Sequence, residues 1–353
     1  VLPTASKDTF IETVLARCES NGWDRAAEFL LGHYFEPQPS VEQLSQVHSS
    51  IAVSFLKRQH QSEPEQAAKL LQELIAGAPR TDSWVAPHLL LSKWMERCDS
   101  ALALHHALEA VSINESSSSA WQQVAMLHFS MIHTAGSDNK YAHVVEAVQG
   151  FAKALANCEV AFVTQNALRL ISLWFSFGIL PEVTNTIIAS LQQIPVSTWL
   201  QIIPQLLARI GIPVETVQIG LLQLLRSIGK SYPHALVFPL IVAERSSGVA
   251  RKKACQRLID ELSADASFRG LLHEASMLST ELIRVAILWT EKWQSTIHEA
   301  AKKHDNIDYV YGLLQPLFEE SENPSTPHEK AFDSEFGQAL RRAREALISH
   351  HCD

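Results

Sequence analysis

The stretch STELIRVAILWTEKWQSTIHEAAKK, residues 279–303, carries a clear helical pattern. Apolar side chains recur in it at every fourth position: Val285, Trp289, Trp293, Ile297 and Ala301. Side chains four residues apart lie on the same face of an α-helix. The spacing therefore predicts one long helix over 279–303 with a continuous apolar stripe. Two tryptophans one turn apart need a large partner surface, which we expect the following segments to supply.

The rest of the chain predicts an all-α fold. Only 13 of the 353 residues are glycine, and most of them fall where helices would end, as at Gly178, where we expect a left-handed stop. Alternating strand patterns bounded by hairpin turns are nearly absent. Successive amphipathic segments with alanine where helices cross are typical of tetratricopeptide- or HEAT-like arrays, although no clean 34-residue period is present. We expect about fourteen to fifteen helices of roughly 10–20 residues.

Two domains are expected, with the boundary near Leu278. Residues 1–278 would form the helical array, curved because Pro204 and Pro239 lie inside helical patterns and each should kink its helix. Residues 279–353 would form three helices of an incomplete bundle, over 279–303, 309–319 and 329–349. No flexible linker separates the two parts, so we expect a rigid connection.

Several long motifs occur in a fixed order along the chain. The C-terminal ones are ELIRVAILWTEKW (281–293), EA (299–300), LLQPL (313–317) and AFDSEFGQAL (331–340). The upstream ones are AVQGFAKAL (147–155), LWFSFG (173–178), TWLQIIPQLLARI (198–210) and HALVFPLIVA (234–243). The first set resembles the rapamycin-binding FRB domain of target-of-rapamycin (TOR) protein kinases, and the second is similar to the FAT region before it. The resemblance covers residues 85–349.

The resemblance implies an FRB-like bundle that lacks its fourth helix. By match to the family, its groove would be lined by Ile297, Ala301 and Trp293. Its core would include Trp289, Leu317 and Phe336. The family's groove binds rapamycin together with its immunophilin and recruits substrates. Since the remaining groove residues belong to the missing helix, the sequence argues against drug binding by this chain alone.

The resemblance further implies a regulatory and scaffolding segment of a TOR-type serine/threonine kinase, in growth and nutrient signalling. Such a segment would frame the kinase cleft and recruit protein substrates. The implied partners are a kinase domain in the same or another chain, TOR-complex subunits and protein substrates. The alternative is a free-standing helical-repeat adaptor. An independent phosphotransferase is a third hypothesis, for which glycine-rich loop and strand patterns are missing. Glu335-Phe-Gly337 and His304-Asp-Asn306 resemble kinase motifs but lack that context.

Composition favours a cytoplasmic protein without cofactors. The net charge of −9 is spread along the chain and does not indicate nucleic-acid binding. Five scattered cysteines suit reduced thiols, and no apolar run approaches the roughly 18 residues of a membrane span. Sixteen histidines show no metal-site spacing. The basic clusters at 251–257, 302–303 and 341–344 are typical of solvated faces, or alternatively of a site for an anionic partner.

Overall fold

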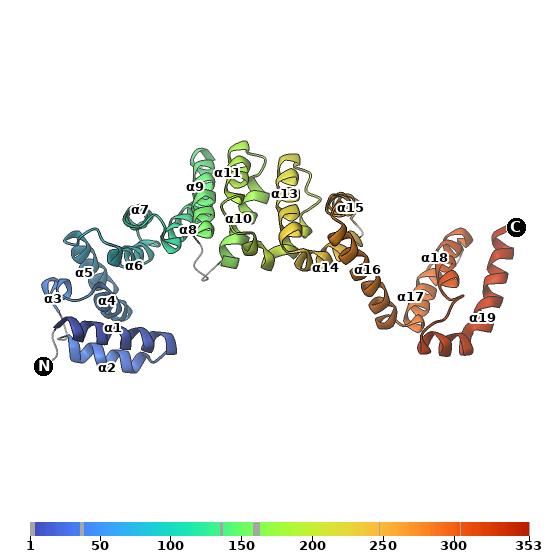
Figure 1. Cartoon of the computed structure of the whole chain (residues 1–353), viewed down its shortest axis with the longest axis horizontal. Coiled ribbons are helices and arrows are strands. Elements are labelled where there is room, and N and C mark those ends of the chain that lie inside the picture. Colours follow the sequence, from blue (N-terminus) through green and yellow to red (C-terminus); the bar gives the residue numbers. More distant parts are fainter. Residues whose placement is uncertain are drawn as a thin grey trace. The chain divides into compact units, whose positions relative to one another are not determined.

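The computed structural model describes residues 4–35, 39–134, 137–157, 163–246, 248–303 and 305–352. Within these ranges the chain forms nineteen α-helices and two short 3-10 helices, and no strand occurs there. The predicted all-α class is confirmed. The chain divides into two compact units, residues 1–262 and 263–353, which are described separately (Figure 1).

The first unit begins with helices that share one hydrophobic core. They are α1 (Thr4–Asn21), α2 (Asp24–Tyr34), α3 (Val41–Ser45), α4 (Ser49–Ser62), α5 (Pro64–Ala76) and, after a 3-10 turn η1 (Asp82–Trp84), α6 (Val85–Met95). Ser40 caps α3 in a reciprocal capping box with Gln43. The sequence predicts a single helix over 41–58, but the segment is divided between α3 and α4. The core of this part is built from fully buried leucines and isoleucines such as Ile51, Leu56 and Leu71.

The helices that follow continue the unit as neighbouring pairs. They are α7 (Ser100–Ile113), α8 (Ser118–Thr134), α9 (Ser137–Ala156), α10 (Val163–Phe177), α11 (Pro181–Leu191), α12 (Ile203–Ala208), α13 (Glu215–Ser231), α14 (Pro233–Glu244) and α15 (Val249–Leu262). A longer 3-10 helix, η2 (Val196–Ile202), precedes α12. The pairs α6–α7 and α8–α9 have the most extensive packing, and α9 also contacts α10 and α11 (Figure 1). Four of the nine buried residues in the α6–α7–α8 core cluster are alanines, whose small side chains let the helices approach closely.

Three predictions for this unit, at two prolines and one glycine, have different outcomes. Pro239 lies inside α14, as predicted. Pro204 does not interrupt a helix, because the segment before it is the 3-10 helix η2 and Pro204 stands in the first turn of α12, where its missing N–H costs nothing. Gly178 does not have positive φ; that conformation is found at Gly22. A side chain at Gly178 would instead collide with Val217 and the Trp174 backbone.

The second unit contains four helices: α16 (Ala266–Ala286), α17 (Trp289–Ala301), α18 (Ile307–Glu320) and α19 (Pro327–Cys352). The prediction of one helix over 279–303 is wrong. Ile287 and Leu288 have extended backbone (φ −104°, ψ 104° and φ −69°, ψ 148°), so the first part of that stretch belongs to α16 and the second to α17. The proposed domain division at residues 278 and 279, and the rigid connection across it, stay predictions.

Candidate protein-interaction site

Two tryptophans of α17 form the centre of the second unit. Trp289 packs edge-on against Phe332 of α19, with ring centroids 5.8 Å apart. Trp293 packs likewise against Phe318 of α18, at 5.0 Å. These four rings make up the buried cluster of the unit. Edge-to-face aromatic packing adds to the free energy gained from burial, so α17 is held to both of the helices that follow it.

The two tryptophans differ in their polar contacts. The Trp293 indole Nε1 donates to Ser321 Oγ at 3.2 Å, and Ser321 Oγ in turn donates to the Leu317 carbonyl at 2.7 Å. Trp289 Nε1 is buried and has no hydrogen-bond partner in the part of the chain that the structure describes. Trp293, predicted to line a groove, is therefore a buried and hydrogen-bonded residue, with 4 % of its surface exposed.

The remaining predicted groove residues lie on the outer surface of α17. Ile297 is 50 % exposed and Ala301 is also exposed, whereas Ala300 is buried. Four residues turn an α-helix through about 400°, so a spacing of four drifts by roughly 40° at each step. The stripe therefore leaves the buried face after Trp293, and Ala300 takes the inner position. Val285 lies on α16 and is 65 % exposed, so it does not extend the stripe.

The predicted core residues are placed differently from one another. Trp289 is buried in the aromatic cluster, and Leu317 packs against that cluster while partly exposed. Phe336, predicted to lie in the core, is 41 % exposed and stays at the edge, with its ring 5.1 Å from Phe332. Positions 332 and 336 are one turn apart on α19, and the helix turns its later residue outward.

A cavity of about 250 Å³ opens beside the aromatic cluster. Its wall combines aromatic rings with charged side chains: Trp289, Phe318, Ser321, Glu322, Phe332, Asp333, Gly337, Leu340, Arg341 and Arg344. At its rim Arg341 pairs with Asp333 at 3.0 Å, and Arg344 pairs with Glu322 at 2.5 Å. An apolar floor with a few polar groups at its edge is typical of sites that bind a side chain or a small ligand.

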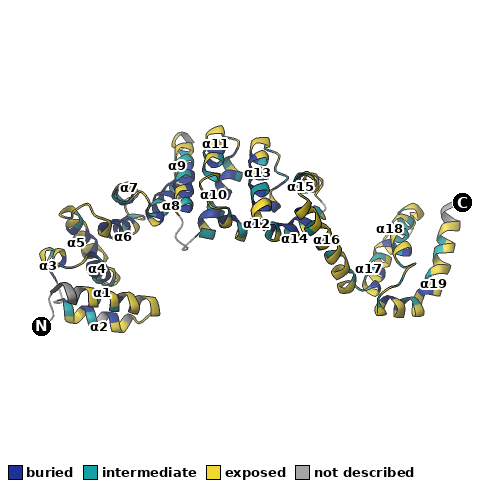
Figure 2. Cartoon of the chain, viewed as in Figure 1, coloured by how far each residue is buried: buried dark blue, intermediate teal, exposed yellow. Residues whose placement is uncertain are grey.

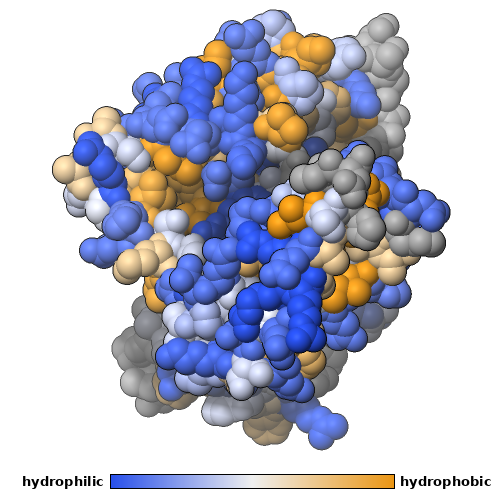
Figure 3. Space-filling model, turned by 90° about the vertical axis from the view of Figure 1, so that its right-hand side faces the viewer, coloured by the Kyte–Doolittle hydropathy of each residue, from blue (hydrophilic) through white to orange (hydrophobic). Residues whose placement is uncertain are grey.

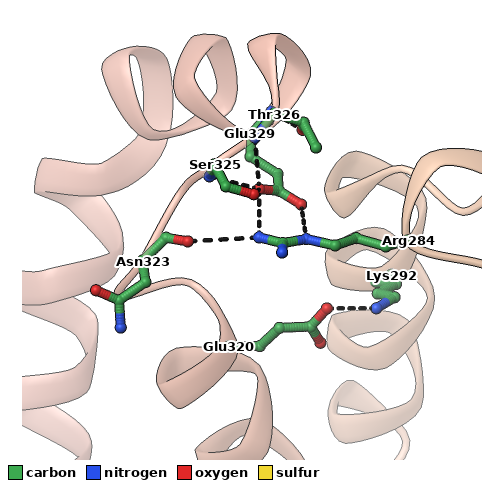
Figure 4. Close-up of polar contacts among 7 residues, drawn as sticks. All are labelled: Arg284, Lys292, Glu320, Asn323, Ser325, Thr326 and Glu329. Carbon is green, nitrogen blue, oxygen red and sulfur yellow. Dashed lines mark hydrogen bonds and ion pairs between the residues drawn. The ribbon is translucent and has the colours of Figure 1, made fainter. Parts of the chain in front are cut away.

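Arg284 connects α16 to the start of α19 (Figure 4). Its guanidinium reaches Glu329 with two bonds, Nε to Oε1 at 2.5 Å and Nη2 to Oε2 at 2.7 Å. Nearby, Lys292 of α17 pairs with Glu320 of α18 at 2.6 Å. Two parallel bonds fix the orientation of both side chains, so the pair holds the last turn of α16 in register with α19.

Glu329 also caps α19. Its carboxylate accepts from the backbone N–H groups of Ser325 and Thr326, at 2.8 and 3.0 Å, while the Glu329 N–H donates to Thr326 Oγ1 at 3.2 Å. This is a capping box. Burial alone would raise the pKa of this carboxyl, but the bonds from Arg284 and from the two backbone groups outweigh it and lower the pKa to about 2. The pattern Thr326-Pro-His-Glu329 is visible in the sequence and could have placed this helix start.

The surface around these contacts is mixed. Figure 2 shows α16 and α19 largely exposed, in contrast to the inner helices of the first unit. Large apolar side chains are exposed along α16: Met277, Leu278, Leu282, Ile283 and Val285. Figure 3 shows, on the face that it presents, hydrophobic side chains gathered in separate patches among hydrophilic ones. Exposed apolar groups of this kind favour contacts with another protein surface.

In the two kinase-like motifs, the described residues have structural roles. Glu335-Phe-Gly337 lies within α19, and a side chain at Gly337 would collide with the Asp333 carboxylate of the rim ion pair. Asn306 caps α18 by accepting from the Tyr309 N–H at 3.0 Å, whereas His304 lies outside the described residues. Among the described residues, no three His, Cys, Asp or Glu side chains are grouped to hold a metal ion.

A cluster of Ser50, Glu12 and His48 was not predicted from the sequence. Ser50 Oγ donates to Glu12 Oε1 at 2.9 Å, and His48 Nδ1 lies 2.9 Å from the same hydroxyl and 3.3 Å from the same carboxylate. A catalytic triad needs the serine and the acid on opposite nitrogens of the imidazole. Here both contact Nδ1, so the cluster ties α1 to the start of α4 and does not activate a nucleophile.

Comparison with known proteins relates both units to one group of kinases. The family model of the FKBP12-rapamycin binding domain matches residues 281–351, which includes the end of α16 together with α17, α18 and most of α19. A second model, the HEAT repeats of ATR-like serine/threonine-protein kinases, matches residues 182–279. No described helix is both long enough and apolar enough to cross a membrane.

Three individual relatives of this chain are also serine/threonine-protein kinases. The chain is 36 % identical over 214 residues to serine/threonine-protein kinase TOR2 of Saccharomyces cerevisiae, covering 60 % of this chain and 8 % of that protein. It is 38 % identical over 207 residues to serine/threonine-protein kinase mTor of Drosophila melanogaster, covering 58 % and 8 %. It is 31 % identical over 245 residues to serine/threonine-protein kinase TOR of Arabidopsis thaliana, covering 65 % and 10 %. The matched part is thus a tenth or less of each relative's length.

Among solved structures, the FAT and kinase domain of CtTel1 aligns over 80 % of this chain and 21 % of that chain, with a TM-score of 0.40 and 12 % identity. A TM-score at this level supports no conclusion by itself, so the relationship rests on the sequence matches. Those matches relate this chain to the TOR-type serine/threonine protein kinases, in the region where helical repeats are followed by the FRB domain.

Proposed function

We propose that this chain is a regulatory and scaffolding segment of a TOR-type kinase in growth and nutrient signalling, acting in the cytoplasm. In this proposal the helical array, as a FAT region, frames the cleft of a kinase domain, and the FRB-like unit recruits protein substrates to it. The observation that carries the proposal is the FRB match over residues 281–351, since it includes the α17 helix with its two buried tryptophans.

The outer surface of α17 supports a recruiting role. Trp289 and Trp293 hold one side of the helix in the core, which leaves Ile297 and Ala301 fixed on the exposed side. A rigid helix that presents an aliphatic and a small side chain one turn apart can receive an apolar residue of a partner. The exposed area is small, so we expect weak and reversible binding, as suits a substrate that must leave after reaction.

The proposal is tested with the purified chain and the kinase domain of a TOR relative. Binding is measured by biolayer interferometry, and phosphorylation of a protein substrate is measured with and without the chain. We expect the chain to bind the kinase domain and to lower KM for the substrate. The variant I297D should raise KM roughly fivefold to thirtyfold, the size expected for one lost apolar contact, with kcat unchanged.

The matched control is S295D, which adds the same charge to the same helix at another exposed position. S295D should leave KM at the wild-type value. The proposal fails if the chain does not bind the kinase domain, or if the two variants raise KM equally. Binding to other proteins without any effect on the kinase reaction would instead favour a helical-repeat adaptor.

A further inference from the structure

Two histidine pairs lie between neighbouring helices of the first unit, the first buried and the second partly buried. His88 of α6 and His106 of α7 face each other with their Nδ1 atoms 3.2 Å apart. His128 of α8 and His143 of α9 repeat the arrangement, with Nδ1 atoms 3.0 Å apart. The pairs lie across the two helix contacts with the most extensive packing in the chain. His88, His106 and His128 are all buried.

Each pair can form its hydrogen bond only if one Nδ1 carries a proton and the other does not. A neutral imidazole has one N–H and one lone pair, so two neutral rings satisfy this requirement. A proton added to the accepting Nδ1 would place two N–H groups against each other at about 3 Å, and the bond would be replaced by repulsion between donors. The distances at both contacts therefore require one donating and one accepting Nδ1, as two neutral rings provide, and exclude a proton on both of these atoms.

The environment of His106 makes a charge on it still less favourable. Its other nitrogen, Nε2, is buried and has no partner in the described part of the chain. Protonation would create a charged N–H there with no acceptor, which costs more than an unused lone pair. For the same reason, the neutral state with the proton on His106 Nδ1 is favoured, so that His88 accepts the bond.

We propose that the two histidine pairs are acid-sensitive latches, that is, contacts that hold two helices together only while they are unprotonated. In each pair, protonation of the accepting imidazole releases the helices, α6 from α7 and α8 from α9. Above neutral pH both latches are closed and this part of the array is tightly packed. As the pH falls, the open arrangement binds more protons than the closed one, so the equilibrium shifts towards loosened helix pairs. The device couples the packing of four consecutive helices to acidification.

On balance, the surrounding charges do not reverse the effect of burial on the first pair. Burial is the main cause of the lowered pKa of His88. It is also the main cause that lowers the pKa of His106 to about 4. His105 on α7 lowers both further, Arg80 acts in the same direction on His88, and Glu109 raises both without cancelling the shift. Arg80 also pairs with Glu109 at 2.5 Å, which weakens the field of that carboxylate.

The second pair lies in a simpler environment. Burial, together with His143, lowers the pKa of His128 to about 4. A histidine whose folded pKa is below its ordinary value of 6.5 stabilises the closed state fully above pH 6.5. That contribution is lost as the pH falls from about 6.5 towards 4. A metal site is not the explanation, since among the described residues neither pair is joined by a third ligand.

Hydrogen exchange of the full chain tests the proposal, with EDTA present throughout. Protection of the amides in α6–α9 is compared at pH 7.5 and pH 5.0 after correction for intrinsic exchange rates, and α13–α14 serve as the internal reference. We expect protection of α6–α9 to fall roughly tenfold to thirtyfold at pH 5.0 relative to the reference, as linkage to one titrating histidine predicts. The double variant H106N/H128N should reduce this fall and leave only the part due to His88, because asparagine can keep a bond to the partner ring and does not titrate.

The control is H234N, which replaces an exposed histidine of α14 and should leave the fall unchanged. The proposal is overturned if H106N/H128N loses protection as the wild type does, or if α13–α14 lose as much as α6–α9. If the double variant does not fold, NMR titration of histidine side chains in the wild-type chain replaces it. His106 and His128 should then titrate near pH 4, and titration of both near pH 6.5 would overturn the proposal.

Discussion

Arg284 and Glu329 are 45 residues apart in the sequence, yet they form a two-point ion pair that joins the last turn of α16 to the first turn of α19. The two side chains differ in solvent exposure: 28 % of the Arg284 side chain is exposed, but only 4 % of the Glu329 side chain. A nearly covered carboxylate is tolerated because a cation and two backbone N–H groups surround it. The contact between the last turn of α16 and the first turn of α19 therefore depends on the charge of a single acid.

Removing that charge should weaken the second unit. The variant E329Q should lower the unfolding free energy of α16–α19 by roughly 2 kcal/mol at pH 7, a value reduced for the partial exposure of Arg284. Because the folded pKa is depressed to about 2, the contribution of Glu329 is complete above about pH 4.5 and is lost as the pH falls towards 2. E329Q should lack this acid dependence. Both effects are measured by hydrogen exchange of these helices as a function of urea concentration and of pH.

The Lys292–Glu320 pair supplies the control, since its carboxylate is more exposed than that of Glu329. E320Q should change stability by less than about 0.5 kcal/mol, as usual for ion pairs near the surface. Equal effects of E320Q and E329Q would contradict the special role of Glu329.

Phenylalanine substitutions should separate the two tryptophans of α17. Both W289F and W293F keep an aromatic ring, but only W293F removes a hydrogen bond, the one from Nε1 to Ser321 Oγ. We expect W293F to lose roughly 1 kcal/mol more than W289F. Chemical denaturation of the matched variants, followed by circular dichroism, would reveal equal losses if the bond were unimportant.

Alanine should have opposite effects at two helical glycines. A Cβ at Gly150 of α9 would lie 2.9 Å from Ala125 Cβ of α8, so G150A should destabilise the array by about 1–3 kcal/mol. A Cβ at Gly270 of α16 would meet no atom within 4 Å, so G270A should stabilise its helix by about 0.5–1 kcal/mol. The signs of the two shifts in melting temperature check the close approach of α8 and α9. A stabilising G150A would mean that these helices lie further apart.

Thiol reactivity should distinguish the described cysteines. Cys98 is exposed, whereas Cys255 is buried. Burial raises the pKa of the Cys255 thiol to about 11, which leaves little reactive thiolate at pH 8. Iodoacetamide should therefore modify Cys98 at least about a hundredfold faster than Cys255, as measured by mass spectrometry of each peptide. Comparable rates in the folded chain would show that α15 opens readily, and urea provides the control in which both thiols react.

The helical class was predictable because the apolar period of nearly four residues recurs through the chain. The break at Ile287 and Leu288 was not, since neither residue is a glycine or proline and both continue the apolar pattern. Tertiary contacts replace local preference there: Arg284 is held by Glu329 on one side of the break, and Trp289 is held by the aromatic cluster on the other.

The site was predictable in part. The pattern of α17 identified Trp289 and Trp293, because tryptophans one turn apart require a common partner surface. It could not show that Ile297 drifts outward, since that depends on where α18 and α19 contact the helix. The histidine pairs were also missed: their members are 18 and 15 residues apart, and only the pairing of helices brings them together.

The course of α16 affects how the segment that matches the FRB family model can be isolated. The family match begins at residue 281, well inside a helix that starts at Ala266. A protein trimmed at Ser279 would keep only about two turns of α16, too few to stay helical in water without support. Arg284 would then lie in a short, frayed helix end, and its ion pair with Glu329 would lose its geometry. Expression of the module should therefore start upstream of Asp265, whose side chain caps α16.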